Sequence, residues 1–178
     1  AVVLTINPQP VANAGADQAI CAGTSANLLA SATAGTSPYS YKWSSGQTVA
    51  GISVSPAITT TYTVTVTDNK GCSNVDQVVV TVNPLPIANA GPDQEVCFGT
   101  MATITASATA GTTPYTYAWS LGLGAGATKQ ITLSSTTTFE VTVTDANGCT
   151  DTDEVTVTVN PLPTVNAGPD QEICNGLA

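Results

Sequence analysis

Residues 59–72 read TTTYTVTVTDNKGC, and residues 136–149 read TTTFEVTVTDANGC. In both stretches apolar side chains alternate with polar ones, a period that predicts a strand with one buried and one solvated face. The positions predicted to be buried are Tyr62, Val64 and Val66 in the first stretch and Phe139, Val141 and Val143 in the second. Gly, Asn and Asp residues follow at 68–71 and 145–148 and predict a hairpin turn before a further strand. The pattern therefore favours an all-β fold.

Both stretches belong to a longer internal repeat. The string NPQPVANAGADQAIC begins at Asn7, and it recurs as NPLPIANAGPDQEVC from Asn83 and as NPLPTVNAGPDQEIC from Asn160. Between these strings SPYSYKW (37–43) matches TPYTYAW (113–119), and the alternating aromatic residues of both are assigned to the core. Three motifs in the same order indicate two complete copies of one domain.

The ends of the repeats follow from a third alignment. AVVLTINP at the start of the chain aligns with QVVVTVNP and EVTVTVNP at the ends of the two copies. About seven short strands in each copy, with a Trp in a central strand, fit a sandwich of two sheets. We therefore expect the last strand of a preceding repeat at 1–8, repeat 1 at 9–84, repeat 2 at 85–161 and the first strand of a following repeat at 162–178.

The motifs resemble a known family. NAGPDQ, the YxW strand and YTVTVTDxxGC followed by VTVTVNP resemble the PKD (polycystic kidney disease) type immunoglobulin-like repeats, in the Cys-containing variety strung in tandem in large secreted surface proteins of gliding and other Bacteroidetes bacteria. The resemblance covers the whole chain and implies tandem immunoglobulin-like β-sandwich domains in an extended array. The family's glycine-aspartate turn after the Trp is replaced here by residues 43–46 and 119–122, so nothing that rests on that turn is carried over.

Composition excludes several classes of partner. Charged residues make up 8% of the chain, against about a quarter in an average protein, and the formal net charge is -9. Such a chain has no cationic patch for phosphates, so neither nucleic acid nor an anionic membrane surface is an expected partner. No apolar run is long enough for membrane insertion, and any secretion signal is expected to lie outside this sequence. The sequence holds no Asn-x-Ser/Thr glycosylation site.

The cysteines recur with the repeat and favour disulfides in an oxidising, extracellular compartment. Free thiols and a metal site are the weaker alternatives, because the chain has no His and no closely spaced cysteines. Two cysteines per repeat favour pairing within each repeat. The polarity of a sandwich favours instead a bridge from one repeat to the next, because the first turn and the last hairpin lie at opposite poles. The candidates are Cys21–Cys72 and Cys97–Cys149 within repeats, with Cys174 unmatched, or Cys21–Cys149 across the junction.

The junctions are rich in proline and in oxygen-bearing side chains. The strings NPQP, NPLP and NPLP predict stiff, extended linkers, with a mobile hinge as the alternative. Carboxylate and amide oxygens near a junction suit Ca²⁺, which would stiffen a rod. The alternative is that these side chains form turns with their own backbone. The candidate ligands are Asn13, Asp17, Asp68, Asn89, Asp93 and Asp145, and no other cofactor is expected.

Catalysis has little support in the sequence. The absence of His removes the common acid-base and triad arrangements, and no nucleophile elbow or phosphate loop is present. The Gly-rich stretch 121–126 is interpreted as a loop, because it has no equivalent in repeat 1 and no helix signal after it. Asp151, Asp153 and Glu154 are interpreted as solvated surface. The chain is therefore not expected to be an enzyme.

The function predicted is structural and adhesive: the rod or fibre body of a secreted bacterial surface protein. Its partners would be neighbouring repeats or identical chains, with surface glycans or proteins as further targets. Single strands at 1–8 and 160–178 are what strand donation between chains would use. The alternative is a carbohydrate- or protein-binding accessory module of a secreted enzyme. It would need an exposed aromatic platform, for which Tyr39, Phe98 and Tyr115 are the candidates.

Overall fold

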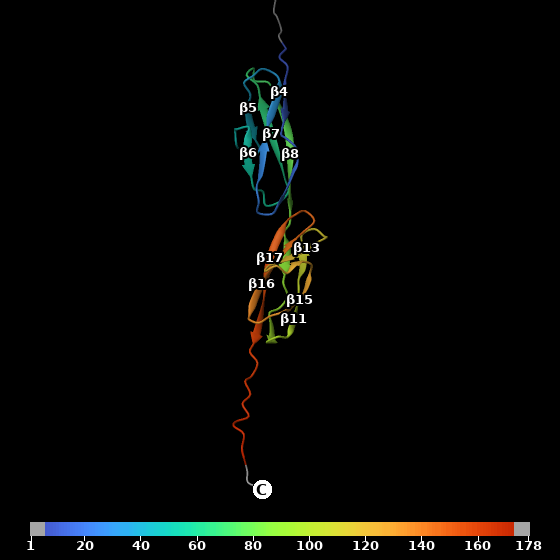
Figure 1. Ribbon diagram of the computed structural model, residues 1–178. Helices are drawn as coiled ribbons and strands as arrows, with labels where there is room; N and C mark the ends of the chain where they lie inside the picture. Colours follow the sequence, from blue (N-terminus) through green and yellow to red (C-terminus); the bar gives the residue numbers. More distant parts are fainter. Residues whose placement is uncertain (1–5, 173–178) are drawn as a thin grey trace, which may run out of the picture.

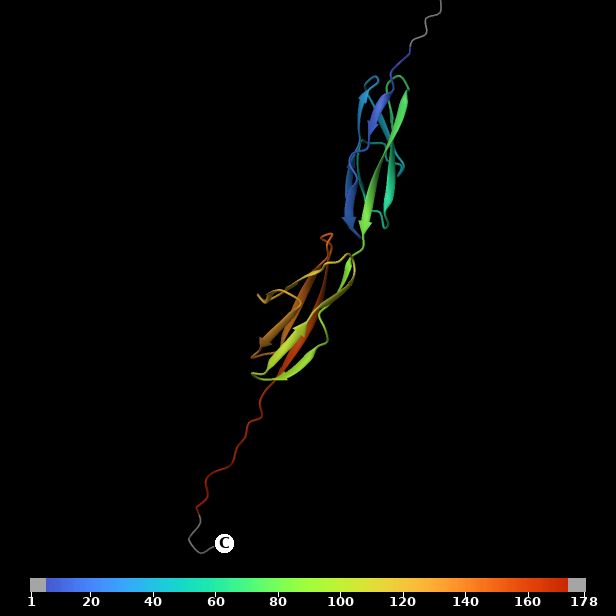
Figure 2. The same cartoon turned by 90° about the vertical axis from the view of Figure 1, so that its right-hand side faces the viewer.

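The computed structural model describes residues 6–172, which form two β-sandwiches in tandem, as expected from the repeat (Figure 1). The two sandwiches follow one another along a common long direction (Figures 1 and 2). The first contains β1 (Pro10–Asn13), β2 (Gln18–Cys21), β3 (Ala26–Leu29), β4 (Ser31–Ala34), β5 (Ser40–Trp43), β6 (Gly51–Val54), β7 (Thr60–Thr67) and β8 (Ser73–Asn83). The second contains β9 (Pro86–Asn89), β10 (Gln94–Cys97), β11 (Met101–Thr105), β12 (Ser107–Ala110), β13 (Thr116–Trp119), β14 (Gly124–Ala125), β15 (Thr128–Thr132), β16 (Thr137–Thr144) and β17 (Thr150–Asn160).

One layer of repeat 1 is a four-stranded sheet in the order β2-β8-β7-β5. β2 runs parallel to β8, whereas the other pairs are antiparallel. The opposite layer consists of the ladders β1-β4 and β3-β6. β3 and β4 are separated only by Ala30, whose N–H donates to the Ala50 carbonyl at 2.9 Å. Repeat 2 has the same arrangement, with β14 added to the edge of its larger sheet.

The core lies between the two layers and confirms the alternation seen in the sequence. Tyr62, Val64 and Val66 of β7 are buried, as are Phe139, Val141 and Val143 of β16. Trp43 fills the centre of repeat 1 at 1% exposure and donates its indole N–H to the Val49 carbonyl at 3.1 Å. Trp119 does the same in repeat 2, with the Gly126 carbonyl as acceptor at 3.0 Å. Each repeat therefore has a core of its own.

The Gly-rich stretch in repeat 2 is a turn rather than a nucleotide-binding loop. β13 leads into this turn, and the chain returns through the short β14, which pairs with β13. The Gly126 carbonyl then lies where the indole of Trp119 can donate to it. Within residues 6–172 no helix is long and apolar enough to cross a membrane.

The expected terminal strands are not formed in the part of the chain that the structure describes. Residues 6–9 carry no strand, and neither do residues 161–172. The counterpart of 163–166 in repeat 2 is β9, which pairs with β12 of its own repeat. A strand needs such a partner for its backbone groups, and none is described beside 161–172. The rest of both predictions, at 1–5 and 173–178, lies outside the described residues.

Candidate functional site

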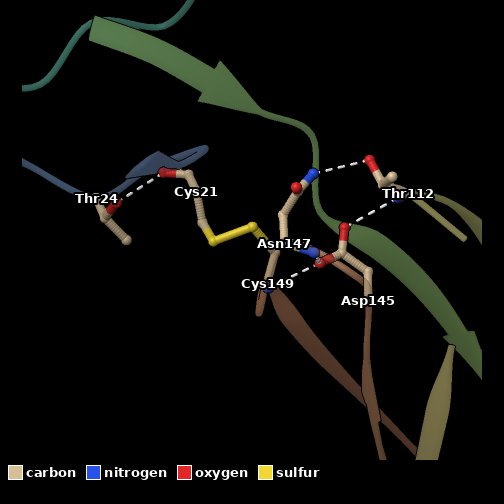
Figure 3. Close-up of a disulfide and its surroundings, with 6 residues drawn as sticks. All are labelled: Cys21, Thr24, Thr112, Asp145, Asn147 and Cys149. Carbon is tan, nitrogen blue, oxygen red and sulfur yellow. Dashed lines mark hydrogen bonds between the residues drawn. A yellow bond between two sulfur atoms is a disulfide. The ribbon is translucent and has the colours of Figure 1, made fainter. Parts of the chain in front are cut away.

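A disulfide between Cys21 and Cys149 joins the two repeats (Figure 3). Cys21 is the last residue of β2 in repeat 1, and Cys149 directly precedes β17 in repeat 2. Their Cα atoms are 5.6 Å apart, within the range that a disulfide requires. The bond is therefore a second covalent connection between the repeats, in addition to the linker.

The pairing within repeats that the cysteine count favoured is wrong, and strand direction gives the reason. β2 runs parallel to β8 with Cys21 opposite Asn83, so Cys21 lies at the end of β8. Cys72 precedes the first residue of the same strand. At about 3.3 Å per residue, β8 separates these two cysteines by roughly 35 Å, far beyond the reach of a disulfide. Cys97 lies opposite Asn160 at the end of β17 and is separated from Cys149 in the same way.

The turn that carries Cys149 is held by the side chain of Asp145 (Figure 3). Its Oδ1 accepts the backbone N–H groups of Asn147 and Cys149, both at 2.9 Å. Its Oδ2 accepts the N–H of Thr112 from the neighbouring loop at 2.9 Å. Asn147 adds a bond from its side-chain amide to the Thr112 hydroxyl at 2.8 Å. One carboxylate thus fixes the position of the cysteine backbone relative to the rest of the sandwich.

These hydrogen bonds also set the protonation state of Asp145. Burial, to 5% exposure, raises the pKa of this carboxyl, but the backbone N–H groups of Thr112, Cys149, Asn147 and Gly148 favour the charged form, and the pKa lies below its ordinary value. The pKa of Asp68 in repeat 1 is lowered in the same way, by the N–H groups of Thr36, Cys72, Lys70 and Gly71 against the effect of burial. Both carboxylates are therefore charged at neutral pH.

The end of β2 that carries Cys21 is also fixed by backbone contacts. Ala22 donates its N–H to the carbonyl of Asn83 at 2.9 Å, which ties the strand end to the last residue of β8. Thr24 donates both its N–H, at 3.0 Å, and its hydroxyl, at 2.7 Å, to the Cys21 carbonyl. The cysteine is thereby held next to the point at which the chain leaves repeat 1.

The linker between the repeats is very short. β8 ends at Asn83 and β9 begins at Pro86, so only Pro84 and Leu85 lie between the two sandwiches. Proline fixes φ and favours extended backbone. The linker and the disulfide are two separate covalent connections between the repeats. Two connections restrict rotation about the junction more than one does, which supports the stiff linker over the mobile hinge.

The predicted calcium ligands are not brought together. Asn13 and Asn89 accept the N–H of the glycine two residues on, at 2.7 Å and 2.8 Å, which is the turn-forming alternative. The carboxylates bind backbone: Asp17 accepts from Val79, Asp93 from Thr156, and Asp68 and Asp145 from the turns that they begin. Within residues 6–172 no three His, Cys, Asp or Glu side chains form a group that could hold a metal ion. In the described residues the candidate oxygens accept backbone N–H groups, which favours the turn-forming alternative, and calcium binding stays a prediction.

The acidic residues of β17 are also more than solvated surface. The carboxylate of Asp151 accepts the N–H of Ala88 at 2.9 Å, and that of Asp153 accepts the N–H of Ala90 at 2.8 Å. Both therefore tie the start of repeat 2 to its last strand, whereas Glu154 is exposed, as expected. In repeat 1 the single contact of this kind comes from Asp76, which accepts from Ala14 at 2.8 Å. The recurrence of Asp76 at Asp153 in the repeat alignment is the sequence signal for the bonds that these two residues accept.

The aromatic candidates for a binding platform do not form one. Tyr39 and Tyr115 each donate their hydroxyl to a carbonyl of the same repeat, Ala34 and Ala110 respectively. Tyr39 packs against the core of repeat 1. Phe98 is 51% exposed, next to Cys97 at the end of repeat 2 away from the junction.

Comparison with known protein families gives a match of residues 92–124 to the SprB repeat. The matched segment begins after β9 of repeat 2 and runs through β10, β11, β12 and β13, and thus contains Cys97 and the Trp119 strand. A search of curated protein sequences finds no match.

Solved structures of tandem β-sandwich domains are similar at low identity. Titin domains I67–I69 are 12% identical over 88% of this chain and 67% of theirs, with a TM-score of 0.49. Two-domain DIP-gamma IG1+IG2 is 14% identical over 86% and 99%, with a TM-score of 0.42. Fibronectin(III)-like modules of CbhA from Clostridium thermocellum are 14% identical over 89% and 100%, with a TM-score of 0.42. The assignment as tandem immunoglobulin-like domains rests on the chain's own strand order.

Proposed function

We propose that this chain is a tension-bearing rod segment of a secreted bacterial cell-surface adhesin. The observation that carries the proposal is the disulfide between Cys21 and Cys149, which links two consecutive domains across their junction. A bridge within a domain would stabilise that domain alone. A bridge between domains serves the connection between them, which is what a spacer or fibre body needs.

The position of the disulfide determines the path that tension takes through the chain. Force entering at Pro10 runs along β1 and β2 to Cys21, crosses to Cys149 and leaves along β17. The residues between the two cysteines, which include Trp43, Trp119 and most of the buried residues of both cores, lie off this path. The sequence separation of 128 means that most of the chain is protected from stretching while the bond is intact.

The SprB repeat match supports placing this rod in a cell-surface adhesin. The disulfide suits an extracytoplasmic location, because thiols stay reduced in the cytosol. A net charge of -9, with few charged residues, leaves broad Thr-rich faces that neighbouring repeats or surface molecules could contact. We propose no catalytic or cofactor-dependent role.

Small-angle scattering and negative-stain microscopy of the purified chain test the rod. The chain is compared with Cys149→Ser, which removes the bridge, and with Cys72→Ser, a matched control that removes a cysteine at the equivalent place in repeat 1. The rod predicts one narrow distribution of end-to-end lengths for the unmodified chain and the control, and a broad one for Cys149→Ser. Equally broad distributions for all three would contradict it.

Self-assembly through the terminal segments is a separate part of the proposal. Strand donation by residues 1–8 predicts filaments that disappear when these residues are deleted. Isolated two-domain particles for both the full and the shortened chain would leave the rod intact and exclude assembly by strand donation.

A further inference from the structure

Two further cysteines occupy the same places in their repeats as the bridged pair. Cys72 follows a turn directly before β8, as Cys149 does before β17, and Cys97 ends β10 as Cys21 ends β2. Neither Cys72 nor Cys97 is paired in the structure. Each therefore corresponds to one half of the Cys21–Cys149 disulfide.

The turn at Cys72 is built in the same way as its bridged counterpart. Cys72 donates its N–H to Asp68 Oδ1 at 2.9 Å, and Asp68 donates its N–H to the Cys72 carbonyl at 2.9 Å. The corresponding distances between Cys149 and Asp145 are both 2.9 Å. The geometry that receives a disulfide at Cys149 therefore exists at Cys72 without one.

The strand end at Cys97 likewise matches the strand end at Cys21. Cys97 lies opposite Asn160 in a parallel pair, and Phe98 donates its N–H to the Asn160 carbonyl at 2.9 Å. The equivalent bond in repeat 1, from Ala22 to Asn83, has the same length. Both half-sites are thus preformed.

Each unpaired cysteine is more exposed to solvent than its paired counterpart in the other repeat. Cys149 is 1% exposed, whereas Cys72 in the equivalent turn is only half-buried. Cys21 is half-buried, whereas Cys97 is exposed. The two open half-sites lie at the ends of the repeats away from the junction: Cys72 directly precedes β8, which leads to the junction, and Cys97 ends β10 opposite the last residue of β17. They cannot meet within one chain, so their partner is another repeat.

We propose that Cys72 and Cys97 are sites of covalent end-to-end joining to further copies of this repeat. Cys72 takes the strand-end cysteine of one neighbouring copy, and Cys97 takes the turn cysteine of another, reproducing the Cys21–Cys149 junction. Two thiols lose two protons and two electrons to form each bond, and a disulfide oxidant such as oxidised glutathione accepts them and leaves as two thiols. This proposal rests on the proposed rod and extends it to a fibre crosslinked at every junction.

The test uses the full chain with Cys174→Ser throughout. Variant A also carries Cys72→Ser and so keeps only the Cys97 half-site; variant B carries Cys97→Ser and keeps only the Cys72 half-site. Control variant C carries Cys72→Ser, Cys97→Ser and Thr103→Cys, which puts an exposed thiol on the side of β11. The variants are mixed in a glutathione redox buffer, and covalent dimers are followed on non-reducing gels and by mass spectrometry.

Complementary half-sites align their thiols, so A with B is expected to form dimers roughly ten-fold faster than A with A, B with B or B with C. Equal rates in all four mixtures would overturn the proposal, because the cysteines would then behave as unrelated exposed thiols. That result would leave the two-repeat rod untouched. The opposite outcome is also distinguishable. If the two-repeat chain proves flexible while A and B still form dimers fastest, the rod is refuted and the end-to-end site is retained.

Discussion

The turns 68–72 and 145–149 have the same backbone hydrogen bonds and differ in one covalent bond. In each, an aspartate accepts the N–H groups of the second and fourth following residues and of a threonine in the neighbouring loop. Only Cys149 of the second turn is bridged to another repeat. The shape of the turn therefore comes from the aspartate, and the disulfide adds the connection between repeats.

This difference distinguishes the stability of each repeat from the coupling between the repeats, which the cysteine pattern alone does not distinguish. Each repeat is stabilised by its own core and by its aspartate-braced turn. The coupling between repeats depends on Cys21, Cys149 and the two-residue linker. Changes at either turn should thus lower the stability of the repeat that contains it, whereas loss of the bridge should weaken the coupling between the repeats and raise the entropy of the unfolded chain.

The largest effect is expected from removing the bridge in Cys149→Ser. Closing a loop of this length contributes about 4 to 5 kcal/mol through the entropy of the unfolded chain. In single-molecule pulling from the termini, complete unfolding of Cys149→Ser should release roughly 450 Å more contour length than the oxidised chain, from a sequence separation of 128 and about 3.5 Å per residue. Cys72→Ser should release no more than the oxidised chain does.

A smaller loss is expected from removing the aspartates. Asp68→Ala and Asp145→Ala each leave three backbone N–H groups without their acceptor, so the melting temperature of the altered repeat should fall. Asp93→Ala, which removes a single backbone contact, should lower it less. Asp145→Ala should also slow the formation of Cys21–Cys149 on refolding, whereas Asp68→Ala should not. Equal slowing by both substitutions would show that the turn does not position the cysteine.

Acid should weaken both repeats through these same two carboxyls. Because the folded pKa of each lies below that of the unfolded chain, the folded state binds their protons more weakly, and their contribution is complete above the unfolded value of about 3.9. It is lost as the pH falls through the lower folded pKa. Denaturation midpoints measured from pH 6 to pH 2 should therefore drop below about pH 4, and the drop should be smaller in Asp68→Ala. An identical drop in Asp68→Ala would assign it to other carboxyls.

The smallest effect is expected at the glycines that touch the aspartates. Gly35 has φ +63, and a Cβ there would lie 3.0 Å from Asp68 Oδ2 and 3.1 Å from the Pro10 nitrogen. Gly71, at φ +81 in the same turn, has open space around a Cβ. Gly71→Ala should cost about 1 to 2 kcal/mol from the backbone conformation alone. Gly35→Ala should cost more in the same urea titration, and the difference measures the close contact.

The sequence predicted the fold well because the alternation of apolar residues is a local signal and the recurrence of the motifs is a periodic one. Alternation over 60–67 correctly placed Tyr62, Val64 and Val66 in the core, and the motif at 68–71 correctly predicted the hairpin. The motif recurrence gave the tandem arrangement. These features need no knowledge of distant contacts.

The partner of each cysteine and the role of each acidic residue could not be predicted so directly. Cys21 pairs with a residue 128 positions away, and only the parallel direction of β2 and β8 rules out the nearer Cys72. The acidic residues resemble calcium ligands by type, but their oxygens accept backbone N–H groups from strands far apart in sequence. Both outcomes depend on tertiary contacts, which composition and spacing do not contain.

A non-reducing tryptic map of the oxidised chain tests the covalent junction most directly. The only lysines are Lys42, Lys70 and Lys129, and the chain has no Arg, so trypsin separates Cys21, Cys72 and Cys149 into different peptides. The account predicts that 1–42 is disulfide-linked to 130–178, and that this link survives in Cys174→Ser and vanishes in Cys149→Ser. A link from 1–42 to 71–129 would join Cys21 to Cys72 or Cys97 in place of Cys149 and contradict the account.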